Sequence, residues 1–450
     1  MKRIFLGYFI TILLFLTEHT VSAGWKAGVA SVKITPQQSM WMAGYGGRDH
    51  VSEGTIHDLW AKALALEDSL GNRAILITAD VLGFPKEISD RIREQLRQKL
   101  HLSESQIILS ASHTHSGPVL PNSLVDIYPL DDVEKEKVKQ YGSFFEAKIV
   151  ALATEAFQTA EPVRIFAGNG VARFQVNRRN NSEQGLVQQT ELKGPNDYAV
   201  PVLKVINRED KLKALVFGYA CHATVLSGYS WCGDYPGFAQ IELERKYPGA
   251  VAMFFQGAGA DQNPIPRRSV PLAKQYGQTL SAAVERVLDE PMQSLPAALS
   301  TAYTEINLAL TPAPSEKELE NIIARSDGYH KRWAERLLSE CKSGKPPMTS
   351  CPYPLQIWNM GGQPVISMGG ELVIEYAIGL KKLFGRDIFV MGYCNDVMAY
   401  IPSVTVLNEG GYEGDTSQQV YGLPSKWTPD IESHIYEKII QLASQVNMTW

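Results

Sequence analysis

Two histidines separated by one residue mark the stretch of the chain with the clearest chemical potential. His113 and His115 stand in the segment SASHTHSGP (residues 110–118), directly after the largely apolar run QIIL (106–109). Alternate side chains of an extended strand point to the same side. We therefore expect both imidazoles to leave the strand end together, before Gly117 and Pro118 turn the chain. The spacing favours two ligands of a metal ion, because imidazole is a common metal ligand. Polar loop histidines bonded to the backbone are the ordinary alternative.

Other polar side chains also follow predicted buried strands directly. They are Asp80, His222, Asp261, Glu371, Asn395 and Tyr400. Sheets built from β-α-β units bind ligands at the carboxyl ends of their strands, so this pattern predicts a metal site at that edge. Taken alone, His222 could be a core histidine, and Glu371 could favour a helix N-terminus. Asp80 and Asp234 could be caps, and Tyr400 would be a core residue by default.

The sequence lacks the motifs of several other enzyme classes. It contains no G-x-S-x-G elbow, no Walker-type phosphate loop and no H-E-x-x-H helix. The segment Gly257-Ala258-Gly259 is not followed by the third glycine of a dinucleotide fingerprint. Cys221 precedes His222, but neighbours in a strand point to opposite faces. That position favours a buried structural cysteine over a thiol nucleophile.

The hydrophobic pattern predicts one large α/β domain with mixed β-sheets flanked by helices. Strands 61–68 and 73–80 form a hairpin around Gly71-Asn72, and Ile88, Ile92, Leu96 and Leu100 recur at helical spacing before strand 106–110. This β-α-β unit implies parallel pairing. Further helices are expected near 133–158, 242–247, 272–288 and 430–445 and from Glu371, with an outer insertion over 313–350. Further strands are expected near 25–34, 163–167, 199–206, 212–219, 250–255, 300–308, 364–368 and 387–391.

Composition and the N-terminus point to an exported globular protein. The 450 residues are 44% hydrophobic and 20% charged, with a formal net charge of −5, which offers no footprint for nucleic acid. Lys2 and Arg3 precede an apolar run over 4–16, and Val21-Ser22-Ala23 provides small residues at −3 and −1. We expect residues 1–23 to be a signal peptide cleaved after Ala23, giving a secreted or periplasmic chain. No segment is apolar for long enough to span a membrane.

The five cysteines give no disulfide framework that can be derived from sequence. An exported chain with five cysteines leaves at least one unpaired. Cys341 and Cys351 flank a short Gly-Lys-Pro-Pro loop and could close a small surface disulfide. Neither the remaining pairing nor the oligomeric state follows from the sequence.

The chain resembles the catalytic domain of the neutral/alkaline non-lysosomal ceramidase family. The most specific stretch is ASHTHSGP (111–118), and shorter similarities occur in the same order along most of the mature chain. These shorter segments are ITP (34–36), AGYG (43–46), LAL (64–66), TAD (78–80), VNR (176–178), CHAT (221–224), MGGE (368–371), YIPS (400–403) and YEG (412–414). The resemblance implies an α/β fold and a zinc-dependent hydrolase of the amide bond in N-acylsphingosine.

The resemblance also implies roles for individual residues. Carried over position by position, one Zn²⁺ would be held by His113, His222, Glu371 and Tyr400. His115 matches a second active-site histidine beside the metal. Arg178 and Tyr412 match residues that hold and polarise the scissile carbonyl. Four further residues are candidates for supporting positions around the ligands: Asp80, Asp234, Asp261 and Asn263.

The chain departs from the family pattern in two places. Where the family carries a serine in a Gly-Asp-x-Ser-Pro-Asn-like loop, this sequence has Asn263, which favours water as the nucleophile. Residues 24–450 leave no room for the family's C-terminal immunoglobulin-like domain, so we expect that domain to be absent. The leading hypothesis is therefore an exported ceramidase-like amidase acting on a lipid or small-molecule amide. Hydrolysis of another amide or ester, and a noncatalytic binding role, are the alternatives.

Overall fold

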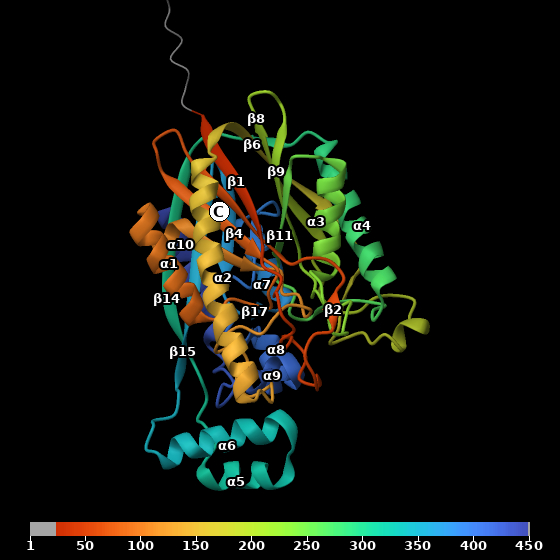
Figure 1. Ribbon diagram of the computed structural model, residues 1–450, viewed down its shortest axis with the longest axis vertical. Helices are drawn as coiled ribbons and strands as arrows, with labels where there is room; N and C mark the ends of the chain where they lie inside the picture. Colours follow the sequence, from red (N-terminus) through yellow and green to blue (C-terminus); the bar gives the residue numbers. More distant parts are fainter. Residues whose placement is uncertain (1–23, 449–450) are drawn as a thin grey trace, which may run out of the picture.

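The computed structural model describes residues 24–448, so the expected signal peptide (1–23) lies outside the described residues. Two β-sheets pack face to face, and helices cover their outer faces (Figure 1). Nearest neighbours within the sheets are parallel in some pairs and antiparallel in others. The α/β class with mixed sheets flanked by helices is confirmed.

The larger sheet has nine strands. Its β4–β5 and β9–β11 pairs are parallel, and the other pairs are antiparallel. In spatial order the strands are β11 (Val251–Gln256), β9 (Leu212–Tyr219), β8 (Ala199–Asn207), β6 (Glu161–Val171), β1 (Trp25–Lys33), β3 (Trp60–Glu67), β4 (Arg73–Ala79) and β5 (Ile107–Ala111), with β13 (Gln293–Leu295) beside β6.

The near-continuous apolar character of these strands follows from burial on both faces. In β4, Ile75 and Ile77 pack toward the helices α1 and α2, whereas Leu76 packs toward the second sheet. The helices on this side are α1 (Lys86–Leu100) and α2 (Asp132–Gln158), and the other half of the same face is covered by α3 (Asp234–Lys246) and α4 (Val270–Leu288). None of the helices within residues 24–448 is both long and apolar enough to cross a bilayer.

The second sheet contains four strands and has its own helical cover. Val365 faces the larger sheet, and its neighbour Ile366 faces the helices, as strand alternation requires. The strands, in spatial order, are β14 (Leu299–Ala309), β15 (Ser350–Met360), β16 (Gln363–Met368) and β18 (Phe389–Met391). The covering helices are α7 (Ile374–Phe384) and α10 (Ile431–Gln445).

Three short strand pairs lie outside these sheets and shape the loops at their ends. They are β2 (Gly54–Thr55) with β10 (Ser230–Trp231), β7 (Gln175–Asn177) with β12 (Gln262–Pro264), and β17 (Glu371–Leu372) with β19 (Tyr400–Ile401). The segment after β19 continues through α8 (Val404–Glu409), the π-helical turn η3 (Tyr412–Thr416) and α9 (Ser417–Val420).

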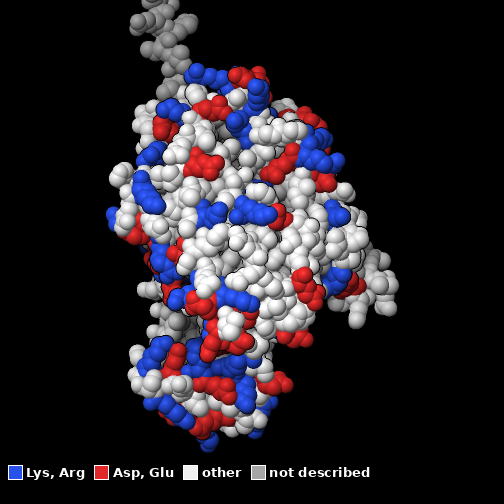
Figure 2. Space-filling view, viewed as in Figure 1, with Lys and Arg blue, Asp and Glu red and all other residues white. Residues whose placement is uncertain are grey.

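The predicted outer insertion is a helical hairpin of α5 (Glu316–Arg325) and α6 (Gly328–Lys342). It lies beyond one end of the sheets, below them in Figure 1, and carries side chains of both charges on the face that Figure 2 shows. Arg336 forms an ion pair with Asp126 at 2.7 Å, and the Trp333 indole donates to the Leu423 carbonyl at 2.9 Å. The hairpin is therefore docked onto loops that approach the candidate site described below.

Three local expectations about secondary structure and disulfides are wrong. Glu371 does not begin a helix: it lies in β17, and α7 begins at Ile374. The helix expected over 242–247 is longer and begins at Asp234. Cys341 is exposed and Cys351 is buried, and both are free, so they do not form the suggested disulfide.

Strand β15 was not expected, because Pro352 and Pro354 interrupt its sequence pattern. It pairs with β14 along its whole length but with β16 only from Leu355 onward. Both prolines therefore lie where one side of the strand has no partner, which is the position that a residue without an N–H tolerates.

Close packing between β1 and α2 gives a stability prediction for Gly28→Ala. A Cβ at Gly28 would lie 1.9 Å from the Ala156 carbonyl oxygen and 2.7 Å from the Ala160 nitrogen. Because backbone must move to make room, we expect unfolding to cost about 2–3 kcal/mol less in the variant. Urea denaturation followed by circular dichroism measures this difference. The matched control is Gly24→Ala, where the nearest atom is 4.0 Å away, and equal losses in both variants would contradict the packing argument.

Candidate metal centre

Three buried histidines converge where strands of the larger sheet end. His113 and His115 follow β5, and His222 follows β9. Their nearest ring nitrogens lie within 4.8 Å of one another, so the three could hold a metal ion. The predicted convergence is confirmed, but strand alternation is not its cause. His113 has a φ of +58°, so the chain turns sharply at this residue instead of continuing as an extended strand.

Backbone carbonyls orient two of these imidazoles. The Nδ1–H of His113 donates to the Leu82 carbonyl at 2.6 Å, and that of His222 donates to the Gly259 carbonyl at 2.7 Å. A hydrogen on Nδ1 leaves Nε2 as an unprotonated acceptor, which is the form that binds a cation. We had expected Asp80 or Asp234 to orient a histidine in this way, but the two bonds come from the backbone.

The Glu371 carboxylate lies between the two oriented imidazoles. Its Oε2 is 3.2 Å from the His113 Nε2 and 3.1 Å from the His222 Nε2. The Tyr400 hydroxyl is 3.3 Å from the same His222 nitrogen. Glu371 and Tyr400 are register partners in the parallel β17–β19 pair, so one short strand pair delivers both side chains to the histidines.

This donor set fits a divalent cation. With Nδ1 protonated, the Nε2 lone pairs of His113 and His222 both face an anionic oxygen of Glu371, and three acceptors repel one another unless a positive charge lies between them. The separations of 3.1–3.3 Å match the roughly 3.3 Å between ligands of a tetrahedral zinc with bonds of about 2.0 Å. His115 provides a further nitrogen, its Nε2 lying 3.2 Å from the His113 Nε2.

The pKa values of these groups favour cation binding at neutral pH. Burial alone would raise the pKa of Glu371, but the imidazoles of His113 and His222 hold it well below its usual range. Burial, with the nearby Arg178 guanidinium, lowers the pKa of His222 to about 4. Burial and the two neighbouring imidazoles also lower the pKa of His115 well below 6.5. The Glu371 carboxylate and the His222 and His115 imidazoles are therefore unprotonated at neutral pH, the form in which such groups bind a cation.

Arg178 approaches the cluster from the end of β7. Its Nη2 donates to the Tyr400 hydroxyl at 3.2 Å, and its Nε donates to Glu413 at 2.7 Å. The Tyr412 ring lies 5.2 Å from the Tyr400 ring and 5.6 Å from the Arg178 guanidinium carbon. Tyr412 is 41% exposed, whereas the four predicted ligands are buried, so it stands at the solvent side of the centre. Burial of its hydroxyl still raises the pKa of Tyr412, which keeps the hydroxyl protonated as a donor.

The other predicted residues brace the loops and do not touch the imidazoles. Asp261 accepts hydrogen bonds from the Asn177 amide at 2.8 Å and from the Ile374 backbone at 2.9 Å, so it ties the Arg178 loop to the Glu371 segment. Asp234 accepts from the backbone of three residues near His222, Asp80 accepts from the Trp60 backbone, and Asn263 accepts from the Thr224 hydroxyl.. Asn395 accepts from the Leu109 backbone and donates to Gln356, which joins β5 to β15.

Two tyrosines that the sequence did not single out complete the surroundings of Glu371. Tyr421 donates to the Oε1 atom of Glu371, and the Tyr393 hydroxyl lies 3.4 Å from its Oε2. Neither tyrosine belongs to a recognisable motif, and both would have been taken as core residues. The sequence could have pointed to them only indirectly. A buried carboxylate such as that of Glu371 needs hydrogen-bond donors, and a tyrosine hydroxyl can be one.

The glycine-rich loop at 42–48 closes over His115. Gly44 has a φ of +99°, and a Cβ there would lie 2.5 Å from the His115 Nδ1. Only glycine allows this approach of the backbone. Arg48 donates to the His115 carbonyl at 2.8 Å, and the Tyr45 ring packs 4.7 Å from the His115 ring.

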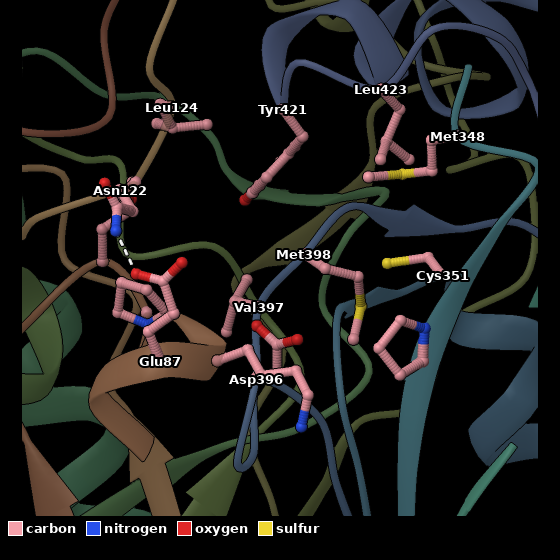
Figure 3. Close-up of a pocket in the computed structure, with 16 residues that line it drawn as sticks. Glu87, Asn122, Leu124, Met348, Cys351, Asp396, Val397, Met398, Tyr421 and Leu423 are labelled. Carbon is pink, nitrogen blue, oxygen red and sulfur yellow. Dashed lines mark hydrogen bonds between the residues drawn. The ribbon is translucent and has the colours of Figure 1, made fainter. Parts of the chain in front are cut away.

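A cavity of about 250 Å³ is lined in part by Tyr421, whose hydroxyl donates to Glu371. Figure 3 shows that Tyr421, Met398, Cys351 and Asp396 face this space, together with the hydrogen-bonded pair Glu87 and Asn122. The histidines do not line it. Tyr421 thus contacts both the cavity and the candidate metal centre.

Comparison with known proteins shows which family of sequences this chain is similar to. The sequence model described as neutral/alkaline non-lysosomal ceramidase, N-terminal, matches residues 25–264. The neutral ceramidase of Drosophila melanogaster is 25% identical over 239 residues, which are 50% of this chain and 33% of that protein. The neutral ceramidase of Pseudomonas aeruginosa is 20% identical over 477 aligned residues, 90% of this chain and 70% of that protein. The chain thus spans about a third of the fly relative and more of the bacterial one.

Solved structures agree on the fold. A crystal structure of neutral ceramidase from Pseudomonas aeruginosa superimposes with a TM-score of 0.73 at 16% identity, covering 95% of this chain and 75% of that one. A structure titled "Ceramidase complexed with C2" gives the same TM-score and identity over 94% of this chain and 75% of the other. The family match at 25–264 contains His113, His115, Arg178 and His222, whereas Glu371, Tyr400 and Tyr412 lie beyond it.

Metal titration distinguishes the possible ligands. We expect His113→Ala and Glu371→Gln each to weaken Zn²⁺ binding by at least about 100-fold, because each removes a donor from the converging set. We expect His115→Gln to weaken it by no more than about 10–100-fold, the range for a supporting residue. Competition with a zinc chelator at pH 7.5 measures all three, and His434→Gln, at a partly exposed histidine of α10, serves as control. Equal losses for His115→Gln and Glu371→Gln would instead make His115 a ligand.

Asp396, beside the cavity, makes stability depend on pH. Burial raises the pKa of Asp396 to about 7, against partial compensation by Lys86. Between about pH 4 and pH 7 the folded chain therefore keeps a proton that the unfolded chain has lost. This contribution is fully present below about pH 4 and disappears as the pH rises through 7. We expect Asp396→Asn to gain about 3 kcal/mol over the parent between pH 4.5 and pH 8.

Urea denaturation of the parent and the Asn variant at both pH values measures this shift. Asp387, which is exposed, is replaced by Asn in the control. A constant difference between parent and Asp396→Asn across the pH range would contradict the buried, protonated state.

Proposed function

Since the chain belongs to the neutral/alkaline non-lysosomal ceramidase family, we propose that it is a zinc-dependent hydrolase of amide bonds, exported by its N-terminal signal peptide. Ceramide-like lipid amides are the leading substrate class, because relatives that align over most of this chain are neutral ceramidases. The observation that carries the proposal is the convergence of the His113, His222, Glu371 and Tyr400 donor atoms at 3.1–3.3 Å.

The proposed zinc ligands are these same four side chains, with the metal at the carboxyl ends of the strands. When bound there, zinc supplies Lewis acidity toward an amide oxygen and lowers the pKa of water to about 7. The chain's own contribution begins with orientation. The Leu82 and Gly259 carbonyls fix the two imidazoles, and Tyr421 fixes the carboxylate, so little rearrangement accompanies binding.

His115 is the proposed acid-base residue. Its low pKa keeps the imidazole neutral at physiological pH, so it can accept a proton from attacking water. Its Nε2 lies 3.2 Å from the His113 Nε2, next to the proposed ligands, whereas its Nδ1 is buried beside the Gly44 backbone. Nε2 is therefore the nitrogen that can accept the proton and return it to the departing amine, which needs one to leave as a neutral group.

Arg178 and Tyr412 are the proposed donors to the oxygen that becomes negative during attack. The Arg178 guanidinium remains charged, because the charges of Tyr400 and Glu413 outweigh the effect of burial and raise its pKa above the ordinary value. Tyr412 keeps its hydroxyl proton. Donors of this kind, preorganised where charge develops, contribute about 3–4 kcal/mol each.

Water is the proposed nucleophile. Asn263 occupies the position of the family serine and accepts a hydrogen bond from the Thr224 hydroxyl at 3.5 Å. A carboxamide has no hydroxyl to attack with. This difference also keeps open a second candidate function, the hydrolysis of a different exported amide or ester.

A substrate panel tests the proposal. Zinc-loaded protein is incubated with fluorescent ceramide, short N-acyl amines and the corresponding esters, and released amine or alcohol is quantified. We expect amide hydrolysis, reduced by about 10²–10⁴-fold in His115→Gln because proton transfer is lost.

Three outcomes separate the hypotheses. Hydrolysis of ceramide supports the leading one, whereas activity confined to small soluble substrates assigns the second function. Zinc binding without turnover of any amide or ester would leave a noncatalytic binding protein. Circular dichroism of His115→Gln confirms that a loss of activity is not a loss of folding.

A further inference from the structure

Two adjacent arginines stand beside the candidate centre without a counter-charge. Arg267 and Arg268 follow β12, the strand that carries Asn263. Within residues 24–448 neither guanidinium forms an ion pair. The one side-chain hydrogen bond that either of them makes to these residues runs from Arg268 to the Tyr45 hydroxyl at 3.2 Å. Each guanidinium has five N–H donors, so most of this hydrogen-bonding capacity is unused.

The neighbouring arginines show the contrast. Arg178 and Arg179 also lie at this end of the sheets, but both bind the Glu413 carboxylate, and Arg179 also binds Glu409. Their charges are therefore neutralised within the chain. Arg267 and Arg268 repel each other instead, and burial followed by the Arg268 charge lowers the pKa of Arg267.

The acidic side chains nearest to this arginine pair either bond to other groups or act on the pair only through space. Glu183 acts on Arg267 through space but makes no hydrogen bond to it. Asp234 acts on Arg268 in the same way, while its carboxylate accepts the N–H groups of Val225, Leu226 and Tyr235. Among the described residues, no carboxylate thus forms an ion pair with either guanidinium.

The loop that carries the pair is held in place. Arg268 adopts a φ of +84°, which is costly for a residue with a side chain. Its N–H donates to the Val225 carbonyl at 2.7 Å, three residues after His222, and the Tyr276 hydroxyl donates to the Pro266 carbonyl at 2.7 Å. The two guanidinium groups are therefore presented from a fixed backbone.

Tyr45 connects this pair to the reacting groups. The Arg268 guanidinium carbon lies 5.5 Å from the centre of the Tyr45 ring, and that centre lies 4.7 Å from the centre of the His115 ring. Arg268 is consequently within about 10 Å of His115. A carboxylate bound bidentately by a guanidinium would lie only a few bonds from a scissile amide beside His115.

We propose that the substrate carries a carboxylate or similar anion close to its scissile amide, and that Arg267 and Arg268 bind it. This inference rests on the proposed amide hydrolysis, but it favours N-acyl amino acids, which carry such a group, over ceramide, which is neutral. A guanidinium pair favours planar anions such as carboxylates. Its positive charge also attracts such anions at long range toward the proposed zinc site.

Paired substrates test the inference on the zinc-loaded full chain. The first pair, N-hexanoylglycine and N-hexanoylglycinamide, differs by a carboxylate on the amine side. The second, the mono-N-ethylamide of adipic acid and N-ethylhexanamide, differs by a carboxylate on the acyl side. We expect kcat/KM to favour the anionic member of one pair by at least about 10-fold, and the pair identifies the side. We expect this preference to fall as salt rises.

Variants assign the preference to the arginines. We expect the double variant Arg267→Gln, Arg268→Gln to bring the anionic-to-neutral ratio of kcat/KM close to one. Replacement of both by Lys should retain part of it, because charge remains without the planar fork. Arg208→Gln, an exposed arginine in the β8–β9 turn, is the matched control and should keep the full ratio. An equal fall for both members of a pair in the Gln variant would make the arginines structural and overturn the inference.

Binding separates this inference from the proposed function. Calorimetry measures the affinity of the same four amides for the His115→Gln variant, with and without the arginine substitutions. Turnover of neutral and anionic amides at equal rates keeps the proposed function and overturns the inference. Arginine-dependent binding of the anionic amide, with no hydrolysis by the parent chain, keeps the inference and rejects the proposed function.

Discussion

The buried carboxylate of Glu371 is the constraint on which the rest of the site depends. Removing a carboxylate from water costs several kcal/mol unless other groups replace its hydration. Here the replacement comes from the imidazoles of His113 and His222 and from the hydroxyls of Tyr421 and Tyr393. These partners come from separate parts of the chain. The charge of Glu371 is therefore compensated only when the two sheets are packed together.

Much of the fold follows from the sequence because its signals are local. Runs such as residues 73–79 are apolar on both faces, and the helix over 86–100 repeats its apolar residues every fourth position. Such elements can be recognised without information from distant parts of the chain. The β17–β19 pair could not be predicted in this way, because two residues give no periodicity and the partners are 29 positions apart. Strand β15 was missed because its prolines oppose the usual pattern, although they lie where no neighbour needs their N–H.

The same distinction holds within the candidate site. The spacing of His113 and His115 led to the correct convergence, although the turn at His113 replaced the extended geometry that we had assumed. Glu371 and Tyr400 were expected as ligands only through the family resemblance, and Tyr421 was not expected at all. Aspartates were expected to orient the imidazoles, because carboxylates commonly do so. Backbone carbonyls of Leu82 and Gly259 perform that task instead, and no residue type in the sequence can reveal a carbonyl contact.

The wide separation of the clustered side chains along the chain has a consequence for folding. His113 and His222 lie in the first half of the sequence, whereas Glu371 and Tyr400 reach the centre only after the second sheet has been added. During synthesis from the N-terminus, the first sheet can therefore collapse while its histidines still face water. Contacts between such distant segments form slowly because a long loop must close first. The complete set of four donors is thus one of the last features of the native structure to form.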